Sequence, residues 1–210
     1  MEVLAEKLGR RYNRQWIFQD FDYHFSFPDS YAVLGPNGSG KSTLLQIISG
    51  FLSPSKGALQ YFEKGKILER ELVYRKISYS APYIEIPTNF TVQEFIHFHF
   101  GLKGTYKNQD PQSWIEDSGL GTHQKKLIRE LSTGLQQRVK LISALGANTQ
   151  LVLLDEPTAN LDEEGKAWFK SLFKEMHQER TIILGSNIPE EYEICRNRIQ
   201  ITNYKKEKAV

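Results

Sequence analysis

Short apolar runs alternate along the chain with amphipathic segments. The runs at residues 31–34, 151–154 and 181–185 are rich in branched residues and are bounded by polar or turn residues. Runs of this length and composition are typical of strands buried on both faces of a parallel sheet. Helices are expected at residues 41–49, ending at Gly50, at about 134–145 and at about 163–176. The order of these elements predicts an α/β fold with a mostly parallel sheet.

The N-terminal part has a different pattern. Alternate residues from Phe21 to Phe27 are aromatic and the residues between them are polar, as in a half-buried antiparallel strand. An antiparallel β subdomain is therefore expected before the main sheet. Residues 57–80 predict further short strands around a turn at 63–65, ending in a strand at 77–80, after which Pro82 and Pro87 interrupt regular structure.

The middle of the chain favours short helices. Helical segments at 92–100 and 113–117 are separated by glycines and prolines, among them Gly101 and Pro111. We expect a small helical insert at about 88–133 within a single domain of residues 1–210. Histidines 97 and 99 are two residues apart, so they do not share a helix face and do not predict a metal site.

Composition narrows the class of protein. The 210 residues suit one domain, and 27 basic against 25 acidic residues give a net charge of +2, with no strong field toward nucleic acid or anionic membrane. No apolar run approaches the roughly 20 residues of a bilayer helix. The single cysteine, Cys195, has no intrachain partner, and residues 1–15 lack the apolar segment of a signal peptide, which predicts a cytoplasmic protein. The lysine-rich residues 205–208 are expected to be a solvated end.

Residues 35–42 read GPNGSGKS and match the pattern G-x-x-x-x-G-K-[ST] between a predicted strand and a predicted helix. Glycines let successive backbone N–H groups point inward around phosphate, and the helix adds its positive end. Lys41 is expected to reach the β- and γ-phosphates, and Ser42 to bind Mg²⁺. The alternative is a glycine turn that binds nothing, although a chance match is roughly 1% in such a chain. The expected contacts are Gly35, Pro36, Asn37, Gly38, Ser39, Gly40, Lys41, Ser42 and Thr43.

Two carboxylates follow the apolar run at 151–154. Asp155 is expected to orient Mg²⁺, and Glu156 to polarise an attacking water. Open α/β sheets place their ligands at this end of the strands. Taken alone, the two residues are more simply interpreted as the start of an acidic loop after a strand. Because the phosphate loop is also present, the interpretation as a Mg²⁺ and water site is preferred.

Residues 131–138, LSTGLQQR, lie between these two motifs, and Asn160-Leu161-Asp162 follows the carboxylates. With the phosphate loop, this order resembles the nucleotide-binding domain of ATP-binding cassette (ABC) transporters over nearly the whole chain. The resemblance implies a P-loop NTPase core and two ATP molecules held between two head-to-tail domains. Ser132 and Gly134 then contact the nucleotide bound to the partner domain.

The resemblance assigns two further positions. Tyr12 matches the aromatic residue that stacks on adenine, with Trp16 as a nearby competitor and ordinary packing as the simpler interpretation. Asp162, with Leu161, matches the loop that links the two nucleotide sites across the dimer. Asp162 also suits the N-cap of the helix that follows, and both roles are compatible.

Three positions depart from the family pattern. Pro82 stands where the family has a glutamine that contacts Mg²⁺ or water, and Asn187 stands where it has a histidine that contacts the γ-phosphate. Leu135 replaces the glutamine that ends the usual LSGGQ segment. Losing a positioned donor can slow catalysis on the order of 100-fold, so slow turnover is expected, with Glu156, Lys41 and Asn187 as the catalytic residues.

The leading hypothesis is the ATP-binding and hydrolysing subunit of an ABC transporter, a homodimer or heterodimer that uses ATP and Mg²⁺. It would lie on the inner face of the membrane through permease subunits, docked near residues 82–100. The aromatic segment 95–100 contributes to that groove or, with stronger support from its composition, to the core of the insert. Alternatives are a regulatory protein that senses ATP with little hydrolysis, and an ABC protein of translation or DNA repair, which the length and charge disfavour. No nucleic-acid partner is expected.

Overall fold

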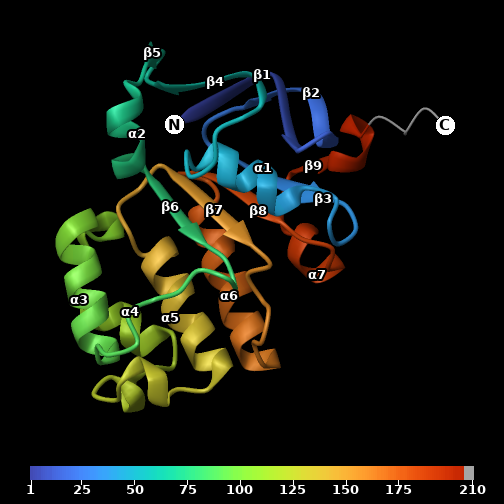
Figure 1. Cartoon of the computed structure of the whole chain (residues 1–210). Coiled ribbons are helices and arrows are strands. Elements are labelled where there is room, and N and C mark those ends of the chain that lie inside the picture. The colour runs from blue at the N-terminus through green and yellow to red at the C-terminus, as the bar shows by residue number, and fades with distance from the viewer. Residues whose placement is uncertain (206–210) are drawn as a thin grey trace.

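Two β-sheets form the framework of the protein, as Figure 1 shows for the computed structural model, which describes residues 1–205. The five-stranded sheet has the order β6-β7-β8-β3-β9, and the four-stranded sheet has the order β2-β1-β4-β5. Of the lysine-rich end expected at 205–208, all but Lys205 lies outside the described residues.

The larger sheet is parallel at every pairing. Its strands are β3 (Asp29–Leu34), β6 (Ile77–Ser80), β7 (Leu151–Asp155), β8 (Thr181–Gly185) and β9 (Asn197–Gln200). The three strands that the apolar runs predict, β3, β7 and β8, are confirmed, and so is the strand predicted at 77–80, which is β6. β9 was not predicted from the sequence, because Ile199 is its only fully buried side chain and a four-residue strand with one apolar residue gives no periodic signal.

Neighbouring residues of the central strands pack into different cores. Leu151 and Leu153 of β7 join a cluster with α1 (Lys41–Ile48) and the antiparallel sheet, which we name the α1 core. Val152 and Leu154 face the opposite cluster, the α5 core, with α5 (Thr133–Leu145) and α6 (Glu163–Met176). β3 and β8 alternate in the same way. The apolar runs are thus buried on both faces because the sheet separates two cores.

The antiparallel sheet confirms the N-terminal alternation. Its strands are β1 (Glu2–Tyr12), β2 (Gln15–Phe25), β4 (Lys56–Glu63) and β5 (Lys66–Ile67). Phe21 and Phe25 are fully buried, whereas Phe27 lies beyond the strand and is 45% exposed. The turn between β4 and β5 has positive φ at Lys64 and Gly65, which suits a tight hairpin.

One part of the strand prediction for residues 57–80 is wrong. A helix, α2 (Arg70–Lys76), lies between β5 and β6. Most of its residues, all but Val73 and Tyr74, are good helix formers. Glu71 lies in the first turn and two basic residues lie in the last, so local propensity and the helix dipole favour the helix. The sequence offers little apolar periodicity there, because only Val73 is buried among residues 71–76.

The helical elements expected in the middle of the chain are present. They are α3 (Val92–Lys103), α4 (Pro111–Asp117) and the short 3-10 helices η1 (Tyr106–Asn108), η2 (Gly121–His123) and η3 (Ile128–Glu130). Phe95, Ile96 and Phe100 are buried in the α5 core, so the aromatic segment is mainly core, while Phe98 is 55% exposed. α3 continues through Gly101, where a break was expected, and ends at Gly104, whose φ is +71°.

Two short elements complete the chain, α7 (Pro189–Tyr192) and the 3-10 helix η4 (Ile201–Tyr204). Across residues 1–205, none of the helices has the combined length and apolar character needed to cross a bilayer.

Candidate nucleotide site

The loop of residues 35–40 joins β3 to α1 and turns through three glycines with positive φ. At Gly40, where φ is +111°, a Cβ atom would lie 2.7 Å from Cγ2 of Ile17. The loop backbone therefore passes so close to the β1–β2 hairpin that only glycine fits. Gly40 is also the N-cap of α1 and has no side chain that could cap the helix. The first N–H groups of α1 therefore face the loop without a side-chain acceptor.

Lys41 holds its positive charge inside this loop. Its Nζ donates to the carbonyl oxygens of Gly35 at 2.8 Å and Pro36 at 3.4 Å, and the residue is only 4% exposed. Burial lowers the pKa of Lys41, and the nearby carboxylates of Glu156 and Asp155 oppose that change. The ammonium group lies where an anion in the loop would contact it.

Asp155 ends β7 and is almost completely buried. Its Oδ2 accepts a hydrogen bond from the hydroxyl of Tyr83 at 3.0 Å, whereas its buried Oδ1 has no partner. Burial raises the pKa of Asp155, and the nearby hydroxyl groups of Ser42 and Tyr83 act against this. The structure thus brings the two expected Mg²⁺ ligands, Ser42 and Asp155, together.

These two residues fit a magnesium ion that is shared with a nucleotide. Both offer oxygen, the donor that Mg²⁺ prefers, and Oδ1 of Asp155 is a buried acceptor in need of a partner. Residues 1–205 contain no cluster of three or more His, Cys, Asp or Glu side chains able to hold a metal. A magnesium ion here would take its other oxygens from phosphates and water, as this ion commonly does.

Glu156 directly follows β7 and faces the phosphate loop across a shared pocket. Its backbone has a positive φ of 45°, and its N–H donates to the carbonyl of Gly185 at 2.9 Å. Together with the loop it lines a pocket of about 250 Å³, formed by Ile17, Asn37, Gly38, Gly40, Lys41, Ser42, Thr43 and Glu156. Of the nine loop residues expected to contact nucleotide, Gly35, Pro36 and Ser39 do not line this pocket.

Asn187, two residues beyond β8, contacts the phosphate loop. Its Nδ2 donates to Oδ1 of Asn37 at 2.9 Å. Pro82 has no side-chain group that can form a hydrogen bond, and its backbone carbonyl accepts from Nζ of Lys140 at 2.7 Å. The side chain that reaches the site from this segment is that of Tyr83, which sequence reasoning missed.

Ser132 and Gly134 lie at the start of α5, away from the phosphate loop. Ser132 is the N-cap and accepts from the N–H of Leu135 at 3.3 Å, and Leu135 packs against the α5 core. A Cβ at Gly134 would lie 2.7 Å from the carbonyl oxygen of Asn160. These residues line a second pocket of about 270 Å³ with Arg138, Asn160 and Asp162, and it shares no residue with the first.

Asp162 has the N-cap geometry predicted for it. Its Oδ1 accepts from the N–H of Gly165 at 2.8 Å, at the start of α6. That bond, followed by the bond from Arg138, lowers the pKa of Asp162. The segment between β7 and α6 is thereby fixed to the LSTGLQQR segment within one chain.

Tyr12 and Trp16, the two candidates for the adenine contact, do not line the phosphate-loop pocket. Tyr12 ends β1, is 47% exposed and carries the guanidinium of Arg10 at 4.7 Å from its ring centre. Trp16 packs closely over Gly9, and a Cβ atom added at Gly9 would lie 2.9 Å from the Trp16 ring. Ile17 is the residue of this hairpin that lines the phosphate-loop pocket, and Tyr12 remains available to a ligand that extends beyond it.

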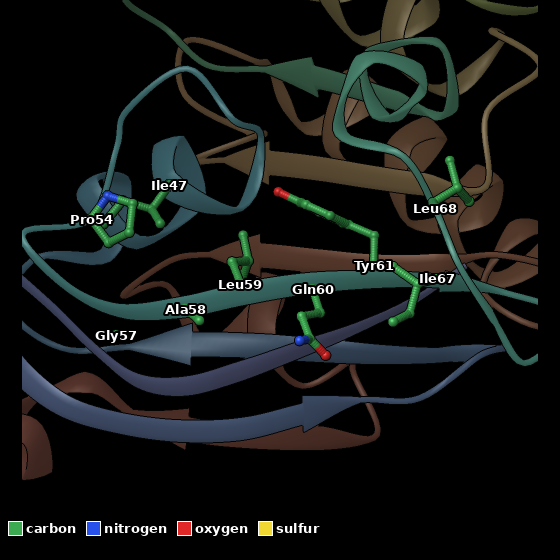
Figure 2. Close-up of a pocket in the computed structure, with 9 residues that line it drawn as sticks. All are labelled: Ile47, Pro54, Gly57, Ala58, Leu59, Gln60, Tyr61, Ile67 and Leu68. Carbon is green, nitrogen blue, oxygen red and sulfur yellow. The ribbon is translucent and has the colours of Figure 1, made fainter.

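A further pocket of about 290 Å³ lies between the end of α1 and the antiparallel sheet, where Figure 2 shows its lining from Ile47 and Pro54 to Leu68. No carboxylate, amine, imidazole or thiol side chain lines it. The hydroxyl of Tyr61, its one ionisable group, donates to the carbonyl of Ile48 at 2.7 Å. The groups suited to phosphate chemistry are therefore gathered at the loop and not here.

The fold and the loop together define a P-loop nucleotide-binding domain, with the phosphate loop between β3 and α1 and two carboxylates at the end of β7. A sequence model described as ABC transporter matches residues 18–159. The chain belongs to the ABC transporter family, and its relatives within that family are ATP-binding subunits.

Two relatives illustrate the similarity. The cytochrome c biogenesis ATP-binding export protein CcmA of Xanthomonas axonopodis pv. citri is 33% identical over 163 residues, which is 78% of this chain and 75% of that protein. The ergothioneine transport ATP-binding protein EgtV of Helicobacter pylori is 32% identical over 180 residues, 84% of each chain.

Solved structures give the same fold. A putative ABC transporter ATP-binding protein from Pyrococcus furiosus has a TM-score of 0.81 at 25% identity, covering 98% of this chain and all of that one. A dimeric ATP-binding cassette in a post-hydrolysis state, bound to ADP and Pi, has a TM-score of 0.82 at 18% identity and 95% coverage of both chains. The latter likeness concerns the fold alone.

Proposed function

We propose that this chain binds and hydrolyses Mg-ATP to drive a transporter whose membrane-spanning part is another polypeptide. The observation that carries the proposal is the convergence of Lys41, Ser42, Asp155 and Glu156 at one edge of the parallel sheet, from two segments more than a hundred residues apart. Phosphoryl transfer requires these four side chains to lie close together, whereas motifs with unrelated roles could lie far apart in the fold.

Ser42 and Asp155 would hold Mg²⁺, which when bound offsets the negative charge of the phosphates. Lys41 contributes a fixed positive charge on the loop side of the nucleotide. Glu156, at the mouth of the same pocket, would orient a water molecule and accept its proton. Asn187 would donate a hydrogen bond to the terminal phosphate in exchange for its bond to Asn37.

Two separate pockets favour a dimer with two nucleotides. Ser132 and Gly134 lie outside the phosphate-loop pocket of their own chain, yet their segment begins a helix, which suits phosphate. We propose that two domains associate head to tail, so that each of these segments closes on the nucleotide of its partner. Tyr12 would then stack on adenine, and Asp162 would connect the two sites.

An exposed apolar surface offers a place for the membrane subunit. Phe90 and Phe98 stack at 5.9 Å between ring centres, and Leu102 of the same helix is 72% exposed. Tyr74 is 59% exposed, and Nζ of Lys103 donates to its carbonyl oxygen. We propose that the helical insert, about 88–133 in a single domain of 1–210, presents this surface to a permease at the inner face of the membrane.

The test is steady-state Mg-ATP turnover of the purified chain as a function of its concentration, beside Glu156→Gln. Turnover that rises more steeply than linearly with protein and is lost in Glu156→Gln supports a dimeric ATPase. Lys41→Ala, which removes the charge in the loop, should instead abolish nucleotide binding. Co-purification with a membrane protein would support the transport role.

Nucleotide binding with no turnover at any concentration would contradict hydrolysis by the chain alone. The relatives named above are described as transport proteins, which gives the alternative of an ATP-sensing regulator no support. Slow turnover remains part of the proposal, because Pro82 and Asn187 replace the expected glutamine and histidine.

A further inference from the structure

Four side chains form a hydrogen-bonded cluster beside the proposed metal site. The hydroxyl of Tyr83 lies 3.0 Å from Oδ2 of Asp155, and Nε2 of Gln46 on α1 lies 3.3 Å from the same hydroxyl. The hydroxyl of Tyr79, on β6, contacts that of Tyr83 directly. Asp155 is thus tied to α1 and β6 through one phenol oxygen.

The direction of each bond in the cluster follows from its chemistry. A carboxylate oxygen only accepts, so Tyr83 uses its single hydrogen on Asp155. Tyr79 must then donate to Tyr83, because the phenol of Tyr83 has no hydrogen left to offer. Gln46 donates through its amide. Tyr83 therefore has its donor and both acceptor positions engaged, and its orientation is fixed.

The backbone places Tyr83 where it can do this. Ser80 of β6 pairs with Leu154 of β7, so the residues that follow these two lie at the same edge of the sheet. The chain then turns, with the N–H of Ile84 donating to Ala81 at 3.2 Å. Lys140 on α5 holds the carbonyl of Pro82 at 2.7 Å. The phenol is thereby delivered to the carboxylate by an anchored loop.

We propose that Tyr83 is a positioning residue for the magnesium site, an inference that rests on the proposed function. Its hydroxyl occupies Oδ2 of Asp155 and leaves Oδ1, which has no partner, as the oxygen presented to Mg²⁺. Groups that hydrogen-bond to metal-binding carboxylates orient them and strengthen metal binding. Tyr83 would do this from the segment in which Pro82 cannot supply a side-chain oxygen.

The experiment measures binding of a fluorescent ATP analogue to the Glu156→Gln chain, which keeps nucleotide intact, while Mg²⁺ is titrated from an EDTA-treated start. Tyr83→Phe removes only the hydroxyl. We expect the Mg²⁺ concentration at half-saturation to rise about 10-fold. Binding of the analogue without Mg²⁺ should be unchanged, since Lys41 and the loop are untouched.

Two matched variants complete the design. Tyr106→Phe removes a phenol hydroxyl that donates to the carboxylate of Glu179, just before β8 and so at the sheet edge opposite Asp155; it should leave the Mg²⁺ midpoint unchanged. Tyr79→Phe keeps the bond from Tyr83 to Asp155 and should shift the midpoint less than Tyr83→Phe. Thermal unfolding of each variant checks that the fold is retained.

A midpoint for Tyr83→Phe equal to that of Tyr106→Phe would overturn the inference while leaving the proposed function intact. Failure of the parent chain to bind the analogue with or without Mg²⁺ would overturn the proposed function as well. A loss in Tyr83→Phe that is equal in the presence and absence of Mg²⁺ would also contradict the inference, because it would locate the effect in the loop.

Discussion

Nη2 of Arg138 lies 2.8 Å from Oδ1 of Asp162, and this pair joins α5 to the residue that caps α6. The arginine side chain is 8% exposed, and its Nη1 also donates to the carbonyl of Ser118 at 2.9 Å. One guanidinium thus connects the insert, the LSTGLQQR segment and the segment after β7. A lysine has a single point charge and cannot make this fork.

Arg138→Lys should therefore reduce the free energy of unfolding by about 1–3 kcal/mol, because a buried carbonyl loses its donor. Urea denaturation measures the change. Arg129→Lys is the matched control, since Arg129 is exposed and its guanidinium donates to the side chain of Asn89. Equal effects of the two substitutions on the free energy of unfolding would show that the two hydrogen bonds of Arg138 add no stability beyond that of an exposed arginine.

Asn187 should set the rate of hydrolysis more than the affinity for ATP. Asn187→Ala removes the donor proposed for the terminal phosphate and should slow turnover on the order of 10- to 100-fold. Asn187→His restores a residue that can carry a proton and should raise turnover above the parent. Steady-state kinetics with kcat and KM separated give the ranking. Turnover of Asn187→Ala equal to the parent would exclude Asn187 from the reaction.

Two glycines at helical positions should respond oppositely to alanine. Gly101 lies in α3 with no atom within 4 Å of an added Cβ, so Gly101→Ala should raise the free energy of unfolding by about 0.5–1 kcal/mol. Gly134→Ala would press against the carbonyl of Asn160 and should lower it by about 1–3 kcal/mol. Chemical denaturation of both variants checks the signs. A stabilising Gly134→Ala would mean that the chain relaxes freely there.

Glu63 should make stability depend on pH. Its carboxylate accepts from Nζ of Lys76 at 3.0 Å and from Gln150, and these bonds, that of Lys76 first, lower the pKa of Glu63 against the effect of burial. A lowered folded pKa means stability that is present above the unfolded value of 4.5 and is lost as pH falls through the folded value.

Glu63→Gln should therefore be less stable than the parent at pH 7, by up to about 1 kcal/mol for a largely solvated ion pair. The difference should shrink below pH 4.5. Thermal unfolding across pH 3–7 measures it, with Glu175→Gln on the exposed side of α6 as the control for loss of a charge. A difference that is constant over this range would rule out the ionised carboxylate as its cause.

Sequence patterns predicted the frame of the protein because each of its central strands contains an unbroken apolar run. α6 begins at Glu163 and ends at Met176, as expected from its apolar stripe and the N-cap Asp162. α2 and β9 escaped prediction because each buries very few side chains, so their position depends on neighbours that the local sequence does not reveal.

The candidate site was predicted wherever a contiguous motif marks it. Tyr83 was missed because its partner Asp155 is 72 residues away and no motif links the two. The available signal was the pairing of two predicted parallel strands: residues that follow Ser80 and Leu154 must meet at one sheet edge.

The alternation of β7 between the α1 core and the α5 core has a mechanical consequence. A strand held by packing on both faces resists bending in either direction, so the central sheet acts as a stiff plate. The phosphate loop leaves this plate from β3 and Asp155 leaves it from β7, with β8 between them. The spacing between the strand that leads into Lys41 and the strand that carries Asp155 is therefore held constant by the sheet itself.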